Sequence, residues 1–131
     1  MTHHTTDAAD HPRKAAEAVR SFNHATLFGR DGRPGLKYPI TAYHAIGAFE
    51  ALAERLPQSF DQTGMALADL LEAGYLAADY GTPAVHVAAT WDALREAEHH
   101  ATALAAALAR AHSASSPLGY SGPIDDDADD L

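Results

Sequence analysis

The segment whose residue types are best suited to chemistry is REAEHHATAL, residues 95–104. Glu96 and His99 have the Glu-x-x-His spacing with which helical bundles bind a pair of metal ions, and His100 follows directly. Carboxylate and imidazole groups are both common metal ligands. The segment therefore raises the question of whether a metal centre lies inside a helical bundle.

The direction of these side chains depends on the helix that carries them. Beyond position 83, apolar residues recur at alternating steps of three and four, as in a packed helical seam. The seam consists of Val87, Thr90, Leu94, Ala97, Ala101, Leu104, Leu108 and Ala111. With this seam inside, Glu96 and His99 point away from the core and His100 lies on its flank. We therefore expect a solvated histidine face, on which these three residues are the metal candidates.

A di-metal bundle also needs a second Glu-x-x-His pair and two further inward glutamates. No other glutamate of this chain has a histidine three residues later. His24 and His44 could meet across the glycine-rich loop that separates them, but two histidines without a placed carboxylate make an incomplete site. No catalytic residue and no cofactor is expected.

Helical spacing of apolar residues, with no strand pattern, predicts an all-α fold. Pro57, followed by the capping-box pair Ser59 and Gln62, favours a break in the middle of the chain. The prediction is a four-helix bundle with a long C-terminal helix, its helices over residues 13–28, 40–56, 57–79 and 83–115. The alternative for the two central helices is one long helix over residues 40–79, kinked at Pro57.

The C-terminal helix has the clearest limits in the chain. Gly81 is suited to end the helix before it, and Thr82 and Pro83 are suited to cap and begin the next one. Pro117 and Gly119 prevent its continuation. We expect large side chains to anchor the core, namely Phe22, Phe49, Leu67, Leu71, Trp91, Leu94, Leu104 and Leu108.

Composition limits the function more than any motif does. The chain has 131 residues and a formal net charge of −9, to which five aspartates among the last seven residues contribute. Negative charge argues against direct binding to nucleic acid or to anionic membranes. Without cysteine, a membrane-span pattern or a visible signal peptide, a cytoplasmic location is the expectation. We expect a disordered tail over residues 1–11, a bundle over 12–116 and a disordered acidic tail over 117–131.

The segment ALAAALARAH, residues 103–112, carries alanine on almost every face. Such a surface lets a second helix approach closely, so two chains could pack here as a homodimer. The interface residues expected on this basis are Ala101, Ala105, Leu108 and His112. The alternative is that other helices of the same chain cover the segment.

Three short strings, FNHATL (22–27), ERLPQ (54–58) and SPLGYSG (116–122), resemble stretches of small alanine-rich helical proteins of actinobacteria. The resemblance covers residues 15–122. It implies an all-helical domain in a bacterial cytoplasm. That group has no assigned activity, so the resemblance transfers no catalytic residue.

The sequence thus favours a non-enzymatic helical protein-interaction module, homodimeric and accessory or regulatory in role. One alternative is a helical bundle that binds a metal or small ligand through histidines, chosen from His24, His44, His86, His99 and His100. Another is a regulator whose aspartate tail masks a basic partner.

Overall fold

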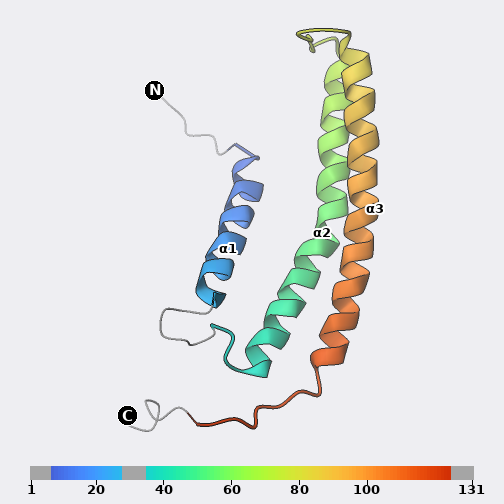
Figure 1. Cartoon of the computed structure of the whole chain (residues 1–131). Coiled ribbons are helices and arrows are strands. Elements are labelled where there is room, and N and C mark those ends of the chain that lie inside the picture. Colours follow the sequence, from blue (N-terminus) through green and yellow to red (C-terminus); the bar gives the residue numbers. More distant parts are fainter. Residues whose placement is uncertain (1–6, 28–34, 125–131) are drawn as a thin grey trace, which may run out of the picture.

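The computed structural model describes residues 7–27 and 35–124 and is all-helical there. Its elements are α1 (Asp10–Thr26), α2 (Pro39–Glu72) and α3 (Pro83–Ser115). Figure 1 shows α2 and α3 as a long antiparallel hairpin, with the shorter α1 beside the lower part of α2. The all-α prediction is confirmed. The count of four helices is wrong, because α2 takes the place of two expected helices.

α2 continues through Pro57, so the break predicted there is wrong, and the alternative of one long helix kinked at this proline agrees with the structure. Proline removes one backbone hydrogen bond and disturbs the preceding turn, but a long helix can absorb this as a kink. α2 is visibly bent between its lower and upper halves in Figure 1. Ser59 caps nothing. Its hydroxyl donates to the Arg55 carbonyl, 3.2 Å away, as serine does inside a helix.

α2 ends earlier than predicted, at a glycine that the sequence analysis passed over. Gly74 has φ of +77°, a conformation that side chains with a Cβ rarely adopt. The Gly74 amide donates to the Leu71 carbonyl and the Tyr75 amide to the Leu70 carbonyl, both at 3.0 Å. This pair of bonds is the Schellman pattern, which satisfies carbonyls left open at the end of a helix.

The limits predicted for the C-terminal helix are confirmed by α3. Gly81 has φ of +66°, and the Thr82 side chain accepts a hydrogen bond from the Val85 amide at 3.4 Å. After α3 the chain runs back beneath the hairpin (Figure 1), and the Tyr120 ring packs edge-on against Tyr38, with ring centres 4.9 Å apart. No helix in the described ranges is long and apolar enough to cross a membrane.

The hairpin is held together by small residues. Ala53 is 2 % exposed and Ala101 6 % exposed, and Gly64 is the third buried residue of the described chain. A Cβ placed on Gly64 would lie 2.8 Å from the Trp91 ring, so the glycine lets the indole pack directly against the α2 backbone. At this point a small residue of one helix makes room for a large side chain of the other.

The large apolar residues expected to form the core are buried only in part. None of the described side chains is fully buried, and Leu104 is 49 % exposed. A hairpin buries one stripe of each helix and leaves the neighbouring stripes open, which explains the difference. α1 adds little cover, because it contains no buried residue. Its Phe22 meets Phe49 of α2 edge-on, with ring centres 5.1 Å apart.

The contact between Gly64 and Trp91 yields the first prediction. Gly64→Ala should lower the free energy of unfolding by about 1 kcal/mol, because overpacking typically costs about 1–3 kcal/mol and the helix propensity of alanine returns about 1. Urea unfolding measures the change, and the emission of Trp91, the single tryptophan, should shift with it. The control is Gln62→Ala at an exposed position of the same helix. A more stable Gly64→Ala variant with unchanged emission would contradict this packing.

Candidate protein-interaction surface

The acid and histidine cluster of α3 faces solvent, as its position in the helix predicts. The side chains of Glu96 and His100 are 74 % and 70 % exposed and lie 3.5 Å apart, four residues along the helix. His99 is exposed as well. The described part of the chain contains no group of three or more side chains placed to hold a metal ion. The prediction that the cluster turns outward is therefore confirmed.

His24 and His44, the other candidate pair, are both exposed. No ring contact or hydrogen bond joins them in the described ranges; the only ring beside His44 is that of its chain neighbour Tyr43, 5.9 Å away. The structure therefore does not bring the two histidines together as a site.

The side of α3 that packs on α2 is rotated slightly from the predicted seam. Thr90 and Leu104, expected inside, are exposed, whereas Trp91 and Glu98 are half-buried. The seam was placed largely on alanines, which fit either a packed or an open side. Larger side chains set the rotation, since the indole of Trp91 occupies the space above Gly64.

His112 lies at a point of contact between the two helices that the sequence analysis did not identify. Its ring stacks on Tyr43 with ring centres 4.1 Å apart, and its Nδ1 lies 3.7 Å from Oε1 of Glu50. Gly47 leaves room for the ring, since a Cβ there would lie 2.9 Å from Nε2. A glycine inside a helix, where it costs stability, was the available signal of such a close approach. The cluster joins the lower ends of α2 and α3.

The four residues expected at a dimer interface lie within or beside the hairpin contact. Ala101 is buried, Ala105 and Leu108 are half-buried, and His112 stacks on α2 as described. The same chain thus covers much of this side of α3, and it does so with α2. The homodimer itself stays a prediction, and the surface available for it is the neighbouring side of α3.

That neighbouring side contains an apolar groove between α2 and α3. The groove has a volume of about 260 Å³ and is lined by Phe49, Leu52, Ala53, Leu56, Leu104 and Leu108. Its two projecting walls, Leu52 and Leu104, are 36 % and 49 % exposed. Leucines project from both helices, and a small residue, Ala53, lies at the bottom of the groove between them. A groove of this kind can accept a row of side chains from another helix.

The groove is part of a longer surface, which we call the apolar face. The helical repeat carries the same side of α2 from Phe49 and Leu52 upward to Leu67 and Leu70, and Leu70 is 41 % exposed. On α3 the apolar face consists mainly of alanines. The apolar face comprises Ala45, Phe49, Leu52, Leu56, Thr63, Leu67 and Leu70 of α2, and Ala93, Ala97, Leu104, Leu108 and Ala111 of α3.

The opposite side of the hairpin is charged. It carries Glu54, Asp61, Asp69, Asp92 and Arg95. The difference between the two sides is informative. A helix surface that stays in water usually carries charged side chains, whereas a surface that is covered by another helix is apolar.

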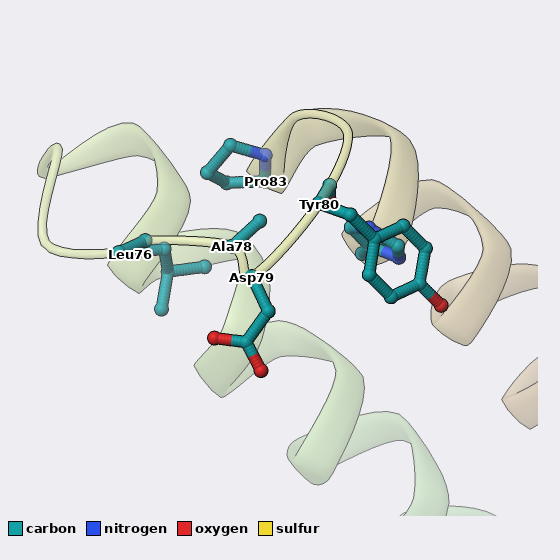
Figure 2. Close-up of a pocket in the computed structure, with 7 residues that line it drawn as sticks. Leu76, Ala78, Asp79, Tyr80 and Pro83 are labelled. Carbon is teal, nitrogen blue, oxygen red and sulfur yellow. The ribbon is translucent and has the colours of Figure 1, made fainter.

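A second hollow lies at the connection between α2 and α3. Figure 2 shows Leu76, Ala78, Asp79, Tyr80 and Pro83 along this connection, where they line a space of about 250 Å³. His86 also lines this hollow; its Nε2 lies 2.7 Å from the Tyr80 carbonyl, and its ring packs edge-on against that of Tyr80. These contacts hold the connection against the start of α3, and they use the one histidine that the hollow contains.

No protein-family model, curated protein or solved structure matches the chain.

Two histidines of α3 provide a test of how the helix is rotated. His112→Ala should lower the free energy of unfolding by about 1 kcal/mol or more, because it removes the stack on Tyr43 and opens a void beside Gly47. His99→Ala, the matched control, should change it by less than about 0.5 kcal/mol. Urea unfolding at one protein concentration compares them. Equal losses for the two variants would mean that His99 is also packed.

Proposed function

We propose that the chain is a non-enzymatic helical protein-interaction module, with an accessory or regulatory role in a bacterial cytoplasm. The observation that carries the proposal is the apolar face, which leaves Leu52, Leu70 and Leu104 between 36 % and 49 % exposed. None of the large side chains that the structure describes is fully buried. Contiguous exposed apolar surface of this kind marks a site of association. The partner surface is an apolar helix, since the groove runs between two helices.

The energetics favour association over a solitary hairpin. Complete burial of a leucine contributes about 1.5–3 kcal/mol relative to its exposure, and the apolar face holds several half-buried leucines. A helix laid in the groove would remove them from water without burying a charge, because no charged side chain lines it. Small residues on the α3 side, such as Ala97 and Ala111, allow the backbones to come close.

The two alternative functions have less support. A metal site built from histidines would need to recruit ligands that the structure leaves apart, since His99 and His100 both face solvent and Glu96 lies beside His100 alone among the described ion pairs. The regulator with an acidic tail depends on residues 125–131, which lie outside the described residues. The interaction module is therefore the function that we propose.

Photo-crosslinking in the source cells tests the proposal. Benzoylphenylalanine in place of Leu52 or Leu104 should form covalent protein adducts, because both side chains project from the groove. The same residue in place of Thr102, exposed on another side of α3, is the matched control and should form few. Adducts are counted on gels and identified by mass spectrometry. An absence of groove-specific adducts in cells that express the folded protein would contradict the proposed function.

A further inference from the structure

We infer that α1 is a displaceable cover of the apolar groove, so that a partner helix has to compete with a segment of the same chain. This role rests on the proposed function and adds its regulation. α1 already touches the groove at one point, because the Phe22 ring meets that of Phe49, which lines the lower end of the groove. Figure 1 shows α1 beside the lower part of α2 and antiparallel to it.

One stripe of α1 is suited to cover an apolar surface. Beyond its first turn, the half-buried residues of α1 are uncharged and recur at steps of four and three. They are Ala15, Val19, Phe22 and Thr26. The lysine, the two arginines and the glutamate of α1 are all exposed. A helix of this kind is stabilised when its apolar stripe lies on another apolar surface, and the groove provides one.

The stripe of α1 matches the groove in spacing. Phe22 is followed, toward the start of α1, by stripe positions three and seven residues away. Phe49 is followed, toward the end of α2, by two groove leucines three and seven residues away. Because the two helices are antiparallel, both series run upward from the ring contact, and closure of α1 brings them together position by position. The resulting pairs are Phe22 with Phe49, Val19 with Leu52, and Ala15 with Leu56.

α1 is held loosely along its length and firmly at its lower end. It contains no buried residue, and among the described helices only α2 and α3 approach one another closely. The hydrogen bonds and ion pairs of the described α1 residues stay within residues 7–27. At the lower end, the Gly35 backbone packs so closely that a Cβ there would collide with the Ala25 carbonyl. α1 can therefore leave the groove and stay tethered beside it, as a competing segment must.

Disulfide trapping tests the cover without any partner, and the chain has no cysteine of its own to interfere. Val19→Cys combined with Leu52→Cys should form a disulfide within one chain in dilute purified protein, because closure of α1 brings the two positions within disulfide reach. The matched control combines Leu52→Cys with Ser21→Cys, which is exposed on the other side of α1. The first pair should form its disulfide about tenfold faster than the control. Non-reducing gels and mass spectrometry measure the rates.

Competition is tested in the source cells with benzoylphenylalanine at Leu104. Phe22→Ala should raise the yield of protein adducts about threefold, because a weaker cover leaves the groove open for a larger fraction of the time. Ser21→Ala, an exposed change in the same turn of α1, should leave the yield unchanged. Circular dichroism of the variants checks that helix content is retained.

Each other outcome overturns a definite part of the inference. A disulfide between Val19→Cys and Leu52→Cys that forms no faster than the control, or only between two chains, would exclude a cover from the same chain. Adducts at Leu104 would then still support the interaction module. Fast trapping with an adduct yield that Phe22→Ala leaves unchanged would exclude competition. Fast trapping without adducts from any variant would contradict the proposed function, and the competition with it.

Discussion

A layer of two helices can bury only the stripes that face each other, and this constraint governs the whole structure. The buried residues between α2 and α3 are Ala53, Gly64 and Ala101, which are small and therefore bury little apolar area. The larger residues lie beside this contact and are covered on one side only. α1 contacts α2 through the edge-on rings of Phe22 and Phe49, but it contains no buried residue and does not complete the layer. The apolar face is thus a consequence of the architecture itself.

The sequence predicted the parts of the fold that backbone chemistry determines. Gly81, Thr82 and Pro83 each favour one position at a helix boundary, and α3 begins where they place it. Pro57 was misjudged because its local preference opposes a helix, whereas packing along the hairpin favours one. Gly74 was overlooked because apolar spacing continues past it to Tyr75, and spacing alone does not reveal that the backbone has turned.

The candidate site was predictable in direction but not in detail. A seam through Leu94 was enough to turn Glu96 and His99 outward, since either lies far around the helix from it. The side of α3 that contacts α2 was harder to predict, because alanine occurs both on packed and on exposed sides of a helix. The Tyr43–His112 stack joins residues almost seventy positions apart, and no periodicity within one helix reports such a pair. Structure was needed to separate the side that makes the hairpin from the side left open.

Oxidative footprinting of Leu52 and Leu104 by hydroxyl radicals, read by mass spectrometry in dilute purified protein and in the source cells, tests the central claim most directly. Both leucines should be labelled in dilute protein and protected in the cells, while Met65, 49 % exposed on the charged side, should be labelled in both. Protection of the leucines in dilute protein would show that the chain covers them itself. Equal labelling in the cells would show that no partner covers them.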